Sequence, residues 1–212
     1  MNAPNGLFLT GTDTDVGKTV AAAWLLPRMK GNYFKPVQAG LSGETDSQVV
    51  QRLSGLSSDR FFPGIYDLQR PMSPHESARL EGVEIDMTRF VLPESDRPLL
   101  VEGAGGLMVP LNRDALIIDL MVQLALPVVL VSRTALGTIN HTLLSLEALR
   151  ARGLEVLGVI LNGPIHEANR RAIATYGHVR ILAEIPHLEP LTHESLRSID
   201  HLDFPLLESM GK

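Results

Sequence analysis

One nine-residue stretch near the N-terminus limits the fold more than any other part of the chain. It runs from Gly11 to Thr19 with the sequence GTDTDVGKT, after an apolar run at 7–9 and before another at 20–26. A strand, a tight loop ending in Gly-Lys-Thr and then a helix are typical of a P-loop. In such loops backbone N–H groups and the helix N-terminus bind phosphate. We therefore predict a phosphate-binding loop here.

The end of this loop carries the residue types that triphosphate chemistry requires. Lys18 would neutralise the β- and γ-phosphates, and the Thr19 hydroxyl would ligate Mg²⁺. The usual spacing places a glycine where Thr12 stands, and Gly11 lies one position too early, so we interpret the motif as a variant P-loop. A chance Gly-Lys-Thr before a helix is the alternative, and the preceding strand argues against it.

Composition removes several classes of function. The chain has 212 residues, a formal net charge of −5 and no cysteine, which excludes disulfides, thiolate zinc sites and cysteine nucleophiles. The net negative charge does not favour binding to nucleic acid or to an anionic membrane. Since no signal peptide or membrane-spanning segment follows the polar first residues, we expect a cytoplasmic protein with one domain over 1–212.

Apolar runs that could form strands alternate with helical patterns along the chain. Besides the run before the P-loop, we predict strands at 32–37, 98–102, 127–131, 156–162 and 180–186. Helical spacing of apolar residues follows at 46–53, 117–126, 143–149, 168–176 and 194–199. This alternation predicts an α/β fold with a mostly parallel, doubly wound sheet.

Charged residues stand where the predicted strands end. Lys35 lies near the end of the second strand, and Glu102 ends a buried strand just before the glycine-rich segment 103–106. In open α/β sheets the carboxyl ends of strands face the ligand crevice, so Glu102 has the position of a second metal-binding carboxylate. Asp46 begins a helical pattern, and two readings stay open for it, a helix cap and a site carboxylate.

Two further segments look like helix starts. Ser73 would be an N-cap followed by Pro74 in the first helical position, with His75 as a polar residue of the first turn. Thr138 or Asn140 could cap the later helix, leaving free backbone N–H groups that can hold a carboxylate. An ordinary capped helix is the alternative for that segment.

Taken together, six segments resemble the dethiobiotin synthetase family, in the family's order and across almost the whole chain. These segments are 11–19 (GTDTDVGKT), 35–37 (KPV), 73–75 (SPH), 101–106 (VEGAGG), 137–141 (GTINH) and 184–186 (EIP). The extended P-loop with its Thr-Asp-Thr insert is the most specific of them.

The resemblance implies a P-loop ATPase fold, a homodimer and an ATP-dependent ring closure. The family's substrates are 7,8-diaminononanoate and CO2, and its products are dethiobiotin, ADP and phosphate. One amine captures CO2 as a carbamate, which attacks the γ-phosphate to give a carbamic–phosphoric anhydride. The second amine then closes the ring. Two unit charges 4 Å apart repel by about 4 kcal/mol at an effective dielectric of 20, so these anionic reactants need cations around them.

The resemblance also assigns roles to residues. Lys18 and Lys35 would be catalytic, with Lys35 stabilising the carbamate and the transferring phosphoryl group. The Mg²⁺ ligands would be Thr19, Asp46 and Glu102. The ATP-binding residues would be Thr14, Asp15, Val16, Gly17, Lys18, Thr19, Val20, Asn162 and Pro186. The substrate-binding residues would be Thr12, Lys35, Ala39, Gly105, Thr138, Ile139 and Asn140. In this assignment the helix start at 138–140 comes from the partner subunit and binds the distal carboxylate.

The chain departs from the family pattern in a few positions. Asp15 stands where glutamate is frequent, and Ala39 where a substrate-binding hydroxyl is frequent. Asn162, expected to read the adenine edge, is followed by Gly-Pro, which weakens the expectation of strict ATP preference. Pro27 is expected to break the first helix early.

Other P-loop classes are the alternative function. A partition-type ATPase would carry an extra lysine early in the loop, where this chain has Thr12-Asp13. An amidase-type relative would carry a second domain with a cysteine nucleophile, and the chain has no cysteine. A nucleotide-binding adaptor without catalysis is the third reading, with Lys35 and Asp46 as surface charges.

Overall fold

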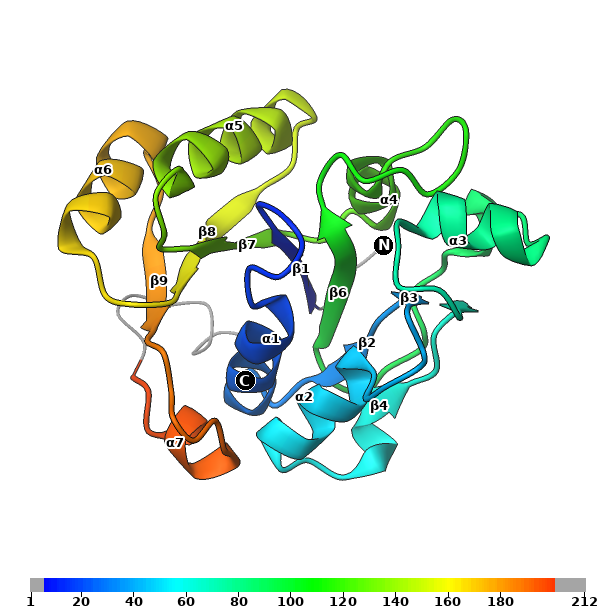
Figure 1. The fold of residues 1–212 in the computed structure, drawn as a ribbon, viewed down its shortest axis with the longest axis horizontal. Coiled ribbons are helices and arrows are strands. Elements are labelled where there is room, and N and C mark those ends of the chain that lie inside the picture. Colours follow the sequence, from blue (N-terminus) through cyan, green and yellow to red (C-terminus); the bar gives the residue numbers. More distant parts are fainter. Residues whose placement is uncertain (1–5, 201–212) are drawn as a thin grey trace.

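The computed structural model describes residues 6–200, which form a central parallel sheet covered by helices on both faces (Figure 1). The main sheet has seven strands in the order β4-β2-β6-β1-β7-β8-β9, and every adjacent pair is parallel. Its strands are β1 (Gly6–Gly11), β2 (Asn32–Phe34), β4 (Phe61–Phe62), β6 (Leu99–Gly106), β7 (Val128–Arg133), β8 (Val156–Asn162) and β9 (Ile181–Ile185). A small second sheet pairs β3 (Val37–Ala39) with β5 (Tyr66–Leu68).

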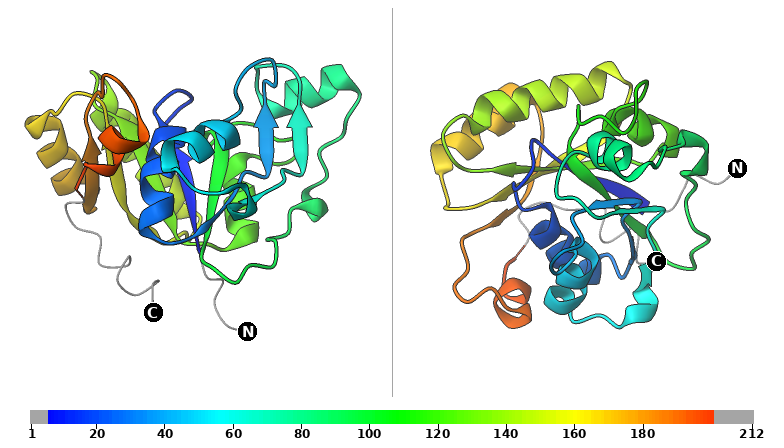
Figure 2. Two further views of the ribbon diagram at one scale, coloured as in Figure 1. Left: turned by 90° about the horizontal axis from the view of Figure 1, so that it is seen from below. Right: turned by 45° about the vertical axis from the view of Figure 1, so that its right-hand side comes forward.

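The helices divide between the two faces of the main sheet. They are α1 (Lys18–Arg28), α2 (Asp46–Ser54), α3 (Pro74–Glu81), α4 (Ile117–Leu124), α5 (Thr138–Ala151), α6 (Glu167–Gly177) and α7 (His193–Arg197), with 3₁₀ turns at Ser58–Arg60 and Met87–Arg89. Helices α1, α2 and α7 cover one face, and α4, α5 and α6 cover the other, while α3 packs beside the small sheet (Figures 1 and 2). The predicted doubly wound α/β fold is therefore confirmed.

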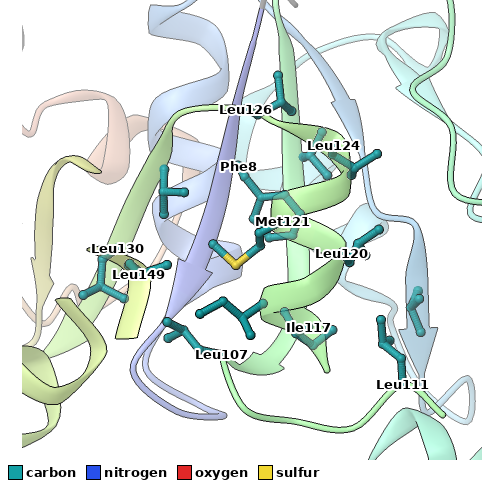
Figure 3. Packing of buried hydrophobic residues seen from close by; sticks show 14 of the residues in the cluster. Phe8, Leu107, Leu111, Ile117, Leu120, Met121, Leu124, Leu126, Leu130 and Leu149 are labelled. Atoms are coloured by element: carbon teal, nitrogen blue, oxygen red, sulfur yellow. The ribbon is translucent and has the colours of Figure 1, made fainter. Parts of the chain in front are cut away.

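Alternation along the central strands builds a separate core on each face. In β1, Leu7 and Leu9 pack toward α1, whereas Phe8 points to the opposite core, because successive side chains of a strand alternate between its faces. Figure 3 shows Phe8 against Met121 of α4 in that second core. A strand buried on both faces reads as a continuous apolar run, which is how β1 appears in the sequence.

Two strand predictions need correction. The strand expected at 32–37 is two elements, because β2 ends at Phe34 and β3 begins at Val37 in the other sheet. Pro36 between them has no N–H to donate to a ladder, which explains the break. The strand expected at 98–102 continues through its glycines to Gly106, which pairs with Gly11 at the end of β1.

Helix boundaries differ from the predictions at three points. The N-cap of α2 is Thr45, which forms a capping box with Gln48, so Asp46 is the first helical residue and not the cap. Gly137 in the left-handed region precedes α5, so neither Thr138 nor Asn140 is its cap. Helix α1 continues through Pro27 and ends one residue later.

The start of α3 agrees with the prediction, with Ser73 as N-cap and Pro74 in the first position, although no side-chain hydrogen bond caps it. Within residues 6–200, no helix combines the length and the apolar character that crossing a bilayer would need.

Candidate active site

A cavity of about 770 Å³ opens at the carboxyl ends of β1, β2 and β6. The sequence-predicted residues that line it are Thr14, Asp15, Gly17, Lys18, Thr19, Val20, Lys35, Ala39, Asp46, Glu102 and Gly105. Segments far apart in the sequence meet there because β6 lies between β2 and β1 in the sheet. The structure therefore brings together both predicted lysines and all three predicted metal ligands.

The P-loop has a tightly specified backbone. Asp15 has a φ of 57° and Gly17 a φ of 92°, both in the left-handed region. The Lys18 ammonium donates to the carbonyl of Asp13 at 2.9 Å, so the lysine side chain folds back over its own loop. A Cβ on Gly17 would lie 2.1 Å from the Asn162 amide nitrogen and would displace that side chain, and the positive φ favours glycine as well. The loop conformation is thus held by its own backbone angles and by the contact of Lys18 with Asp13.

Lys35 lies between two carboxylates. Its ammonium is 2.9 Å from Asp46 Oδ2 and 3.1 Å from Glu102 Oε1, and it also donates to the carbonyl of Gly103 at 3.3 Å. Lys35 is 3% exposed and Glu102 is fully buried, whereas the Asp46 side chain is 35% exposed toward the cavity. Two carboxyl groups thus share the ammonium of Lys35.

The hydroxyl of Thr19 joins the same cluster from the start of α1. It donates to Asp46 Oδ1 at 2.9 Å and lies 3.3 Å from Glu102 Oε1. Hydroxyl and carboxylate oxygens are the hard ligands that Mg²⁺ prefers, and Mg²⁺ is commonly held by one or two carboxylates together with substrate phosphates. The three predicted ligands therefore fit this ion through the chemistry of their donor atoms.

Burial and neighbouring charges shift the pKa values in this cluster. Burial alone would lower the pKa of Lys35, but the Glu102 and Asp46 carboxylates hold that pKa above its ordinary value. Burial would raise the pKa of Asp46, but Lys35 holds it below its ordinary range. Burial lowers the pKa of the Lys18 ammonium, against the opposing field of Glu102. The charged forms of Lys35 and Asp46 thus stabilise each other.

Two polar residues that hydrogen-bond the predicted metal ligands were absent from the sequence predictions. Tyr33 donates its hydroxyl to Glu102 Oε2 at 3.0 Å, and burial, followed by the Glu102 charge, raises its pKa well above 10. Gln38 accepts the Asp46 backbone N–H at 3.3 Å and donates to the carbonyl of Ala39 at 3.1 Å. Each is a polar residue in a short strand and contacts a predicted metal ligand on another element, so no local motif marks it.

The predicted base-binding residues lie on the other side of β1 from this cavity. Asn162, at the end of β8, donates its side-chain amide to the carbonyl of Val16 at 3.2 Å. Pro186 follows β9, and the N–H of Gly163 donates to the carbonyl of Ile185 at 2.9 Å, which ties the two strand ends together. Asn162 thus contacts the P-loop, while neither it nor Pro186 lines the cavity beside Lys35.

Four predicted substrate-binding residues also lie outside the cavity. The backbone N–H of Thr12 donates to the carbonyl of Val131 at 3.0 Å. Thr138 is buried, with its hydroxyl 2.8 Å from that of Ser132. Ile139 is partly buried, and Asn140 is exposed at the start of α5. Their roles in substrate binding stay predictions.

The chain is similar to a consistent group of known proteins. The AAA domain family matches residues 5–195. The chain is 53% identical over 191 residues to the ATP-dependent dethiobiotin synthetase BioD of Nitrobacter hamburgensis, covering 90% of each chain. It is 50% identical over 194 residues to the protein of the same name from Paramagnetospirillum magneticum, covering 92% of this chain and 94% of that one.

Solved structures show the same fold at low sequence identity. A ParA family ATPase from Chlorobium tepidum superposes with a TM-score of 0.50 and 15% identity, over 93% of this chain and 90% of that one. A nucleotide-binding protein from Archaeoglobus fulgidus, in complex with ADP, gives a TM-score of 0.51 and 16% identity, over 92% and 87%. These likenesses support the P-loop NTPase fold alone.

Proposed function

This chain belongs to the dethiobiotin synthetase family, and from that premise we propose how its residues carry out the family's reaction. The protein is an ATP-dependent ligase that forms dethiobiotin from 7,8-diaminononanoate. The observation that carries our assignment of residues is the meeting of Lys18, Lys35, Thr19, Asp46 and Glu102 in one cavity.

The reaction gathers negative charge in one place, and the lysines offset it. A carbamate oxygen attacks the γ-phosphorus of ATP, and the bond from that phosphorus to the bridging oxygen breaks to release ADP. The second amine then attacks the carbamoyl carbon, and phosphate leaves as the ring closes. Because the attacking and attacked groups are both anionic, cations fixed beside them lower the barrier to their approach.

Lys18 is the cation of the P-loop. Its ammonium has three donors, of which the Asp13 carbonyl takes one, so two can reach phosphate oxygens. Burial lowers the pKa of the Lys18 ammonium by removing water from it, so a bound phosphate would stabilise the charged form of the lysine. We assign Lys18 to the β- and γ-phosphates for this reason.

Lys35 contacts two of the proposed metal ligands directly. Its three N–H donors face Asp46, Glu102 and the carbonyl of Gly103. The ammonium can turn to a carbamate only when another cation neutralises these acids. We therefore assign Asp46, Glu102 and the Thr19 hydroxyl to Mg²⁺, which when bound supplies charge stabilisation for the phosphates and the transferring phosphoryl group.

We propose binding roles for the other predicted residues. Asn162 would read the adenine edge with Pro186 beside it, while Gly105 and Ala39 would line the substrate path. We propose that the start of α5, at 138–140, binds the distal carboxylate from a partner subunit in a homodimer. We further propose that residues 1–212 form one domain of a cytoplasmic enzyme.

Phosphate release is the direct test of this function. ATP hydrolysis to ADP and phosphate should require both 7,8-diaminononanoate and bicarbonate, and each omission should remove it. Release that ignores the diamine would reject the assignment and favour a partition-type ATPase or another P-loop class. Light scattering at several protein concentrations tests the homodimer, and a strict monomer would reject the proposed role of the α5 start.

A further inference from the structure

The Glu102 carboxylate has a separate hydrogen-bond donor at each oxygen. Lys35 and Thr19 contact Oε1, and a tyrosine hydroxyl donates to Oε2. Tyr33 is fully buried in β2, and its hydroxyl donates to Glu102 Oε2 at 3.0 Å. Glu102 is fully buried too, so water cannot take the place of a missing donor at this carboxylate. A buried ionised carboxylate needs each of its oxygens hydrogen-bonded or paired.

The strand geometry explains why one tyrosine and one lysine share this acid. Tyr33 and Lys35 are two residues apart, so their side chains project on the same face of the chain. Leu100 and Glu102 have the same spacing on the neighbouring strand, and Tyr33 is paired with Leu100. Lys35 takes Oε1 and Tyr33 takes Oε2, so Glu102 is held from both sides.

The other carboxylate oxygen of Glu102, Oε1, faces the metal-binding cluster. Glu102 Oε1 lies 3.3 Å from the Thr19 hydroxyl and 3.1 Å from the Lys35 ammonium. We propose that Tyr33 is a positioning residue that fixes the Glu102 carboxylate with Oε1 toward the metal-binding cluster. This inference rests on the proposed role of Glu102 as a metal ligand, which it deepens by naming the group that orients it.

Packing alone does not account for a tyrosine at this position. The ring of Tyr33 lies against Phe61, with centroids 5.5 Å apart, and a phenylalanine would preserve that contact. The hydroxyl adds the hydrogen bond to Glu102 and a second hydrogen bond with the Ser47 side chain, and only the first holds a predicted metal ligand. Tyr33→Phe therefore removes the proposed positioning and leaves the packing in place.

The experiment measures the Mg²⁺ requirement of Tyr33→Phe. Groups that orient metal ligands typically change metal affinity by 10–100-fold when removed, so the half-saturating Mg²⁺ concentration should rise about 10-fold, with a smaller change in kcat. Calorimetry of Mg²⁺-dependent ATP binding, without the diamine, should show the same loss of affinity. The matched control is Tyr66→Phe, which removes another buried hydroxyl, bonded to the Asp86 N–H at 2.8 Å, and should leave the Mg²⁺ requirement unchanged.

A second variant separates failure of this inference from failure of the metal site. If Glu102→Gln raises the Mg²⁺ requirement and Tyr33→Phe does not, the positioning role is overturned and the metal site stands. If Glu102→Gln has no effect, both proposals fall. Should Tyr33→Phe not fold, the double variant Tyr33→Phe/Glu102→Gln decides, because it leaves no unpaired buried charge. Recovered folding supports the inference, and a double variant that stays unfolded overturns it.

Discussion

Replacing Lys35 by methionine should destabilise the protein in a way that Mg²⁺ can repair. Methionine keeps the length and most of the volume of lysine but removes the ammonium between Asp46 and Glu102. The two acids then face each other with no cation between them. Because Glu102 is fully buried, its charge has no solvent to screen it.

The cost can be estimated from the burial of the pair. Removing one partner of a buried ion pair typically costs about 3–5 kcal/mol. Asp46 is 35% exposed, so its contribution is partly screened and the lower end of that range applies. A chain of this length loses roughly 2–4 °C in Tm per kcal/mol, so we expect a Tm about 10 °C lower.

Mg²⁺ should bind the methionine variant more tightly than the parent, since Lys35 no longer competes for the same oxygens. At a Mg²⁺ concentration 100 times its Kd, binding to the folded state alone adds about 2.7 kcal/mol, which restores most of the lost stability. Turnover should stay at least about 100-fold down even when stability is restored, because the cation at the carbamate is missing.

Thermal unfolding with and without Mg²⁺, followed by phosphate release in the same buffers, measures both effects. Lys30→Met is the matched control, since Lys30 is exposed and makes no ion pair within residues 6–200. An equal Mg²⁺-induced gain in Tm for Lys35→Met and the parent would refute the shared-oxygen reasoning. Near-parent turnover after Mg²⁺ rescue would refute the catalytic role.

The other expected outcomes concern the P-loop and the metal ligands. Lys18→Ala should abolish phosphate release while Tm and the circular dichroism spectrum stay near the parent's, and unfolding instead would make Lys18 structural. Glu102→Gln should raise the half-saturating Mg²⁺ concentration at least about 10-fold in the same assay, and an unchanged value would remove it from the site. Gly17→Ala should weaken ATP binding about 100-fold in calorimetry, because its φ of 92° strains alanine and its Cβ would displace the Asn162 amide. Gly106→Ala, whose Cβ would meet its nearest atom at 3.4 Å, should bind ATP like the parent, and equal losses in both would contradict the steric argument.

The main features of the fold and site followed from sequence because they depend on local patterns. The P-loop fixes Lys18 and Thr19 through one contiguous motif. Lys35 and Glu102 followed from a topological rule, since parallel strands end at the same edge of a sheet. Asp46 was correctly expected near the cavity under one of its two readings, although the cap of α2 proved to be Thr45.

Features that depend on partners far away in the sequence could not be predicted from it. Tyr33 stands in a short apolar strand and looks like a core residue, because its hydrogen-bond partner is 69 positions away. The sheet of β3 and β5 has three residues in each strand, which is too short for a readable period. The break at Pro36 could have been read from the missing N–H, since proline interrupts central strands.

The place of β1 in the sheet has a consequence for synthesis on the ribosome. Among the strands of residues 6–200 this one is made first, but its neighbours are β6 on one side and β7 on the other, so both edges are covered only after Arg133. At roughly 5–20 residues per second, the wait is on the order of 10 s. A nascent chain stalled before that point carries an apolar strand with unpaired edges, which is a template for aggregation. The ATP-binding end of the enzyme thus matures from the middle of the chain, although its motif emerges first.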